Sequence, residues 1–181
     1  MSQVYSEIEE LFTSGVSEEY LGEDVKLVEH MLQCAALARE AGVSDELVVA
    51  SLLHDIGHLL IPSSATDYDS GVDAHHDEVG AAWVADRFPE AVSEPVRLHV
   101  EAKQYLVATD AGYLAKLSEA SRRTLEMQGG VFSKEQAESF ISQPWAREGV
   151  QLRIWDDLGK VRGKVVPELG TYREAIVKLA G

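Results

Sequence analysis

The chain has 181 residues, a hydrophobic fraction of 45% and a formal net charge of −15, which is enough for one domain with a sizeable core. The negative charge argues against nucleic acid and anionic membranes as partners, because both repel an acidic protein. Cys34 is the single cysteine, which excludes an internal disulfide and favours a reducing compartment. No apolar run approaches the roughly 20 residues that span a bilayer, and the acidic start has no signal-peptide core. We therefore expect a cytoplasmic protein without a membrane partner; its oligomeric state stays open.

Helical periodicity predicts an all-α fold, a single helical domain over 1–181 with roughly seven to nine helices. We expect N-caps at Ser44 and Ser93, a capping box from Ser133 to Gln136, and a helix opened by Pro144. Residues 59–74 are rich in Pro, Ser, Asp and Gly and are expected to form a long, functional loop. Helical patterns or helix-start signals mark the segments at about 3–13, 23–41, 45–58, 76–88, 93–106, 110–116, 118–127, 133 onward, 144–156 and 170–179.

Basic residues are unevenly distributed along the chain. Only three of the sixteen, Lys26, Arg39 and Arg87, precede residue 97. Such a gathering of cations is compatible with a site for an anionic substrate. A solvated basic face is the simpler interpretation, and composition alone favours it.

All six histidines lie between positions 30 and 99. A lone histidine on an apolar helix face is usually a satisfied core residue. Here, however, four successive predicted helices each offer one, and the pair in "LLHDIGH", His54 and His58, is spaced to share a helix face. If they meet, a metal ion is the cheapest way to satisfy so many imidazoles, and Asp55 adds carboxylate oxygens. Nitrogen and oxygen ligands without thiolate suit iron or manganese at least as well as zinc.

These residues carry a resemblance to a known family. "HDIGH" after a buried helix, with a histidine one helix earlier, resembles the all-helical HD superfamily. The wider pattern resembles the HD-domain organophosphonate dioxygenases, in order and with sensible spacing from about residue 20 to 160. The segments that carry it are "YLGE", "EHMLQCA", "SLLHDIGH", "HDEVGA", "HVEAKQYLV", "YLAKLSEASRRTLEMQGG" and "RIWDDLGK".

The resemblance implies a mixed-valent pair of iron ions, Fe(II)/Fe(III), with O2 as cosubstrate. Asp55 would bridge the two irons, and the six ligands would leave open positions, as catalysis requires. His75, beside the implied ligand His76, is expected to face solvent. The implied ligands are His30, His54, Asp55, His76, His99 and Asp156.

The resemblance also implies a phosphonate site and a gate. Tyr20 and Glu23 would act at one iron, covering it until substrate arrives, and Glu23 would suit a substrate ammonium group. Lys103 lies one helical turn beyond the implied ligand His99, so this cation is expected to point the same way as the metal ligand. The residues implied to hold the phosphonate are His58, Lys103, Ser121 and Arg153, and Ser118 could replace Ser121.

The implied reaction is oxidative cleavage of a C–P bond in a small-molecule phosphonate. The substrate would be 2-amino-1-hydroxyethylphosphonate, giving glycine and phosphate, or its trimethylammonium analogue, giving glycine betaine and phosphate. A trimethylammonium group would call for an aromatic cage, with Tyr20, Tyr68 and Tyr105 as candidates. Two other functions stay open: a metal-dependent HD phosphohydrolase acting on a phosphomonoester or nucleotide, and a metal-binding module without turnover.

Overall fold

The computed structural model describes residues 2–15, 20, 22–61 and 76–181. Within these ranges it contains eleven α-helices, one 3-10 helix and no β-strand, which confirms the all-α prediction. The helices are α1 Gln3–Ser14, α2 Leu27–Glu40, α3 Asp45–Leu53, α4 Ile56–Leu60, α5 His76–Ala85, α6 Glu90–Thr109, α7 Tyr113–Lys116, α8 Glu119–Met127, α9 Lys134–Ile141, α10 Ala146–Leu158, η2 Leu169–Tyr172 and α11 Arg173–Leu179. None of these helices has the length and apolar character needed to cross a membrane.

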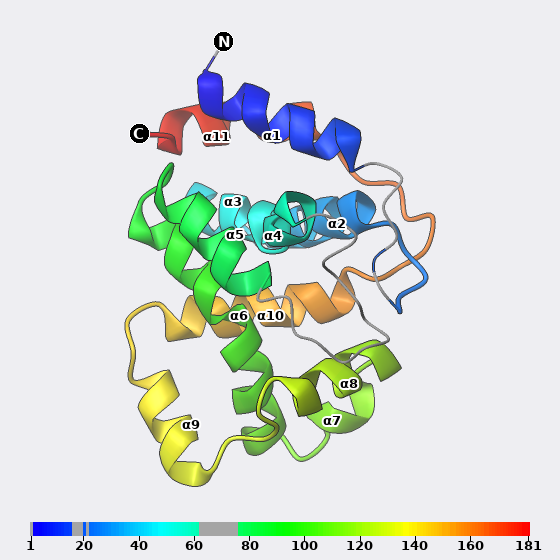
Figure 1. The fold of residues 1–181 in the computed structure, drawn as a ribbon, viewed down its shortest axis with the longest axis vertical. Coiled ribbons are helices and arrows are strands. Elements are labelled where there is room, and N and C mark those ends of the chain that lie inside the picture. Colours follow the sequence, from blue (N-terminus) through cyan, green and yellow to red (C-terminus); the bar gives the residue numbers. More distant parts are fainter. Residues whose placement is uncertain (1, 16–19, 21, 62–75) are drawn as a thin grey trace.

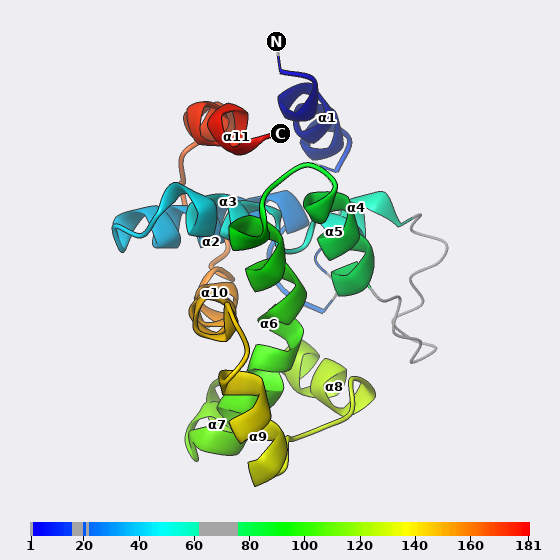
Figure 2. The ribbon, with the colours of Figure 1, turned by 90° about the vertical axis from the view of Figure 1, so that its left-hand side faces the viewer.

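Helices α2 to α5 form the middle of the molecule (Figure 1). The terminal helices α1 and α11 lie together on one side of it, and α10 lies on the opposite side in both views (Figure 2). The long helix α6 packs most extensively against α10 and also against α5. Its second half extends away from the middle, and α7, α8 and α9 gather around it. The first half of α6 therefore faces the central helices, where the histidines lie.

The main hydrophobic core joins the terminal helices to the central ones. Ile8 of α1, Met31 of α2, Leu52 of α3 and Ile176 of α11 are all fully buried in it. Burying a side chain of this size stabilises the fold by about 1.5–3 kcal/mol. Cys34 of α2 is also completely buried.

The helix expected over 45–58 is broken, and this is the main correction to the predicted elements. Ser44 is the N-cap as predicted, and its hydroxyl accepts a bond from the Leu47 amide. However, α3 ends at Leu53, and Asp55 leaves the helical region with φ −105° and ψ 15°. The chain then re-enters a helix, α4, so His54 and His58 are not on one continuous helix face.

Other boundaries also differ from the prediction. Ser93 is not an N-cap, because α6 begins at Glu90 and the Ser93 amide already donates to the Pro89 carbonyl. The capping box from Ser133 to Gln136 is confirmed in both directions. More helices are present than expected, since two predicted helices, 45–58 and 170–179, are each split. Of the predicted loop, residues 59 and 60 are helical, and 62–74 lie outside the described residues.

Candidate metal centre

Asp55 lies at the centre of a buried cluster of histidines. Its Oδ2 atom is 3.5 Å from Nε2 of His30 and 3.4 Å from Nε2 of His54. Its Oδ1 atom is 3.8 Å from Nε2 of His76 and 3.7 Å from Nε2 of His99. The two carboxylate oxygens thus face two different pairs of imidazoles, contributed by α2, the α3–α4 junction, α5 and α6.

Asp156 of α10 completes one side of this cluster. Its Oδ1 atom is 3.4 Å from Nε2 of His30, and the side chain is buried. All six side chains that the sequence resemblance implied as metal ligands therefore converge, with His30, His54 and Asp156 on one side of Asp55 and His76 and His99 on the other.

Backbone carbonyls fix the orientation of three of these rings. Nδ1 of His30 lies 3.0 Å from the Gly159 carbonyl oxygen, Nδ1 of His54 lies 2.9 Å from that of Ser51, and Nδ1 of His99 lies 2.6 Å from that of Val96. A carbonyl oxygen can only accept a hydrogen bond, so each Nδ1 carries the proton. In the neutral rings every Nε2 then presents a lone pair to the centre of the cluster, as a metal ligand does.

Among the described residues, no positive charge lies between the nitrogen and oxygen atoms that face the centre of the cluster when its rings are neutral. Nε2 of His30 and Nε2 of His54 are only 3.1 Å apart, so with both rings neutral their two lone pairs would repel each other. Oδ2 of Asp55 and Oδ1 of Asp156 are buried without a hydrogen-bond donor, although unpaired buried carboxylate oxygens are costly. Cations would satisfy all four atoms at once. The donor set therefore fits bound metal ions, and its nitrogen and oxygen chemistry suits iron.

Ring protonation differs within the cluster. Burial opposes a charge on His30, but Cys34 and the Asp156 and Asp55 carboxylates raise the pKa of His30 well above its usual range, so without a metal this ring holds a proton that a bound ion would displace. Burial lowers the pKa of His54 to about 4, and burial also lowers the pKa of His76. Both rings are thus neutral near pH 7, which is the form that binds a metal.

Two glycines let α4 and α5 approach closely enough to build the centre. A Cβ atom placed on Gly57 would lie 1.8 Å from the His76 carbonyl oxygen and 3.0 Å from the Gly80 amide nitrogen. A side chain at Gly57 would therefore push α5 away. These glycines, in "HDIGH" and "HDEVGA", hold His76 against Asp55.

Beside the metal cluster lies a group of buried cations. Nη1 of Arg153 is 2.8 Å from Oδ2 of Asp156, and its Nη2 lies 3.4 Å from the Ser121 hydroxyl. The predicted pair Ser121 and Arg153 is thus brought together next to a metal-cluster residue. Ser118, the predicted substitute for Ser121, instead caps α8 by accepting from the Ser121 amide.

Lys103 and His58 reach the same region from other helices. Nζ of Lys103 donates to Thr124 Oγ1 at 2.8 Å and to Gln128 Oε1 at 2.7 Å, so it is held by the α8 end. The His58 ring stacks on His76, with ring centroids 3.9 Å apart. Burial lowers the pKa of His58 to about 3, so at neutral pH this ring is uncharged and can act only as a neutral hydrogen-bonding partner.

Tyr20 and Glu23, the predicted gate, both lie against this region. The Tyr20 ring stacks on His30, with centroids 4.4 Å apart and an interplanar angle of 14°. Oε1 of Glu23 accepts bonds from the Ser118 hydroxyl at 2.6 Å and from Nζ of Lys160 at 2.9 Å.

Sequence reasoning missed two charged residues of this region, Lys160 and Asp157. Asp157 receives hydrogen bonds from the Arg153 guanidinium and from the Tyr113 hydroxyl. A signal for both was present: Lys160 follows Asp156 by four positions, and Asp157 follows Arg153 by four, which is the spacing of one helix face. On an ordinary helix the same spacing marks exposed ion pairs, so it did not single them out.

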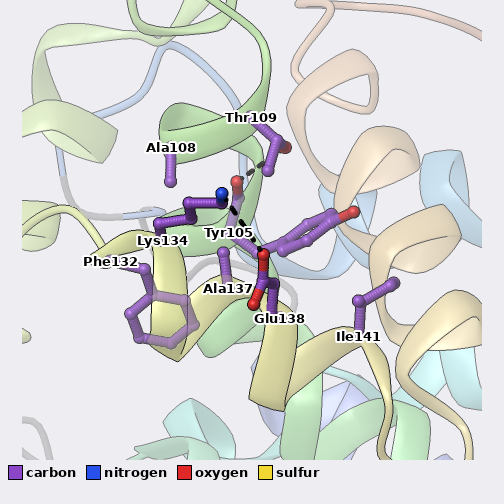
Figure 3. Close-up of a pocket in the computed structure, with 8 residues that line it drawn as sticks. All are labelled: Tyr105, Ala108, Thr109, Phe132, Lys134, Ala137, Glu138 and Ile141. Atoms are coloured by element: carbon purple, nitrogen blue, oxygen red, sulfur yellow. Dashed lines mark hydrogen bonds and ion pairs between the residues drawn. The ribbon is translucent and has the colours of Figure 1, made fainter.

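Of the three tyrosines named as candidates for an aromatic cage, Tyr105 lies away from the metal cluster. Tyr105 lies two positions from Lys103 on α6, on another face of the helix. It packs on Phe140 and lines a separate pocket of about 330 Å³ between α6 and α9 (Figure 3). Tyr68 and His75 lie outside the described residues, so Tyr20 is the single cage candidate that the described chain places at the site.

Comparison with known proteins agrees with this geometry. Residues 27–127 match the HD domain. The chain belongs to the HD-domain family. It is 39% identical over 169 residues to the [1-hydroxy-2-(trimethylamino)ethyl]phosphonate dioxygenase (glycine-betaine-forming) of Leisingera caerulea, covering 93% of this chain and 86% of that protein. It is 40% identical over 158 residues to the hydroxymethylphosphonate dioxygenase of Gimesia maris, covering 87% and 79%. Within the HD-domain family, the chain is thus grouped with hydroxyalkylphosphonate dioxygenases.

Proposed function

We propose that this HD-domain protein is an O2-dependent dioxygenase that cleaves the C–P bond of a small 1-hydroxyalkylphosphonate at a pair of iron ions. The position of Asp55 carries this proposal, because one carboxylate facing two separate imidazole pairs is the arrangement that a bridged two-metal site needs. The names of both relatives, each a dioxygenase of a hydroxylated phosphonate, support the reaction class.

The proposed ligands divide into two sets. His30, His54 and Asp156 would hold one iron, His76 and His99 the other, and Asp55 both. The bound metals would supply the activation of O2 and the electron transfers that protein side chains cannot perform. The carbonyl-bound Nδ1–H groups would keep the three rings oriented.

The role of the neighbouring cations is to bind and orient the phosphonate. Arg153 offers N–H donors, Lys103 an ammonium group, and Ser121 a hydroxyl, next to the metal cluster. In a buried setting such charge-assisted bonds fix the reacting carbon relative to the metals. His58 would add a neutral hydrogen bond, and Tyr20 and Glu23 would cover the site and exclude water until substrate enters.

The substituent on the hydroxylated carbon of the substrate is a narrower question. The candidates are an aminomethyl, a trimethylammoniomethyl or no substituent, that is, products glycine, glycine betaine or formate. Glu23 suits a cationic substituent, and the single cage candidate Tyr20 gives a quaternary ammonium group less support. A phosphohydrolase would use the same cations, but the names of the relatives do not favour it.

The test is turnover by protein reconstituted anaerobically with ferrous iron and ascorbate. Each of the three hydroxyphosphonates is added, followed by O2, and phosphate and the carbon product are measured. We expect phosphate only when iron and O2 are both present. Phosphate release without O2, or hydrolysis of phosphomonoesters with a redox-inert metal, would instead establish the hydrolase.

A further inference from the structure

Lys160 occupies a position between the proposed gate and the proposed phosphonate site. It lies just beyond the end of α10, with a side chain that is 11% exposed. Its Nζ atom is 2.9 Å from Oε1 of Glu23, 3.0 Å from Oγ of Ser121 and 3.6 Å from Oδ1 of Asp156. The carboxylates of Glu23 and Asp156 thus both face this ammonium group.

Two cations point to the same hydroxyl. The Ser121 oxygen receives Nζ of Lys160 at 3.0 Å and Nη2 of Arg153 at 3.4 Å. A hydroxyl can accept two hydrogen bonds, and carboxylates already balance both cations, Arg153 through Asp156 and Asp157 and Lys160 through Glu23. Because N–H donors of both cations reach this hydroxyl, the space beside it is suited to an oxygen atom of an anion.

Glu23 supplies the present counter-charge to Lys160. It comes from the segment before α2 and also accepts the Ser118 hydroxyl at 2.6 Å. A phosphonate dianion carries more charge than a carboxylate and has three acceptor oxygens, so it competes effectively for the same ammonium group. When such an anion is bound, Lys160 no longer needs Glu23 as its counter-charge.

We propose that Lys160 is a further phosphonate-positioning residue, which exchanges Glu23 for a phosphonate oxygen when substrate binds. This assignment rests on the proposed function, since it takes the anion of that substrate as the ligand. Anion binding and release of the Glu23 segment are then one event, in which a single ammonium group changes partners.

A second ion pair offers a matched control. Arg162 and Asp24 connect the same two segments of chain at 3.3 Å, but both side chains are 78% exposed. Exposed pairs of this kind contribute little. Neutralising either member alone changes the net charge of the same surface without touching the buried site.

The experiment measures binding of methylphosphonate, a phosphonate with no hydroxyl and no amine, to iron-loaded protein under argon by calorimetry. Lys160→Met should weaken binding about 10-fold or more, the usual effect of losing a charged hydrogen bond, and Lys160→Arg should restore most of it. Glu23→Gln should tighten binding, because it removes the competitor. In the Lys160→Met background Glu23→Gln should have no effect, and Arg162→Met and Asp24→Asn should change nothing.

Unchanged affinity in Lys160→Met, or equal tightening by Glu23→Gln with and without Lys160, would overturn the proposal. Glu23→Gln alone decides the matter if Lys160→Met does not fold: weaker or unaltered binding contradicts the exchange. If these binding differences hold but no phosphonate is turned over, the dioxygenase proposal fails and the Lys160 assignment stands.

Discussion

Asp156 shares its carboxylate between Arg153 and the histidine cluster. Oδ2 lies 2.8 Å from Nη1 of Arg153, and Oδ1 lies 3.4 Å from Nε2 of His30. One side chain therefore positions both the proposed metal site and the principal cation of the proposed phosphonate site. This explains how two sites built from different helices keep a fixed distance, which catalysis by positioning requires.

Asp157 should stabilise the fold by balancing the buried Arg153. Arg153 is 5% exposed and bonds to Asp157 through Nε and Nη2, while Asp157 is also held by Tyr113. Asp157→Asn leaves the positive charge of the buried guanidinium only partly balanced. It should lower the free energy of unfolding by about 3 kcal/mol. Tyr113→Phe removes only a neutral donor and should cost about 1 kcal/mol. Urea denaturation followed by circular dichroism measures both.

The control for Asp157→Asn is Asp110→Asn, which removes a carboxylate paired with the exposed Lys116. It should leave the unfolding curve almost unchanged. An equal loss in the two variants would mean that Arg153 does not depend on Asp157.

Gly57→Ala should disrupt the metal centre through the backbone. Its added methyl group would overlap the His76 carbonyl, so α5 must shift and carry His76 away from Asp55. We expect a loss of at least about 2 kcal/mol in unfolding free energy together with reduced iron content. Gly170→Ala, which meets no atom within 4 Å, should change neither. Full iron content in Gly57→Ala would show that the close contact of α4 and α5 is not needed.

Phosphonate affinity should depend on the protonation of Lys103. Burial, followed by the charge of Arg153, lowers the pKa of Lys103 to about 7. Below that pH the ammonium attracts the anion; as the pH rises through 7, the free protein loses the charge, and affinity should fall by up to about tenfold per pH unit. Arginine does not lose its proton in this range, so Lys103→Arg should flatten the profile.

The measurement is the ratio of methylphosphonate affinities of the parent protein and Lys103→Arg from pH 6 to 9. Titration of the ligand itself cancels in this ratio. A ratio that stays constant across the range would contradict a low pKa at Lys103.

Many of the site residues could be predicted from the sequence, but their geometry relative to one another could not. Inward histidines on successive helices were visible because metal ligands must lie on the buried faces that periodicity reveals. The break at Asp55 was not, because "SLLHDIGH" is locally as helical as its surroundings, and close packing of Gly57 on α5 decides the outcome. Because the break was not predicted, the division of the two Asp55 oxygens between two histidine pairs could not be predicted either.

Long-range ion pairs were the other part that sequence could not supply. Lys160 forms an ion pair with Glu23, from which it is separated by 137 positions of the chain. No periodic pattern connects residues at that separation. Local devices such as the Ser44 cap and the Ser133 capping box were predictable, because their partners lie within one helical turn.

The most direct test of a bridged two-iron centre is the iron content of three proteins prepared anaerobically with excess ferrous iron and then desalted. We predict about two irons per chain in the parent protein and about one in each of His30→Ala and His99→Ala, because these rings face opposite oxygens of Asp55. Mössbauer spectra should then show different remaining iron sites in the two variants. One iron per chain in the parent protein, or the same remaining site in both variants, would contradict the account.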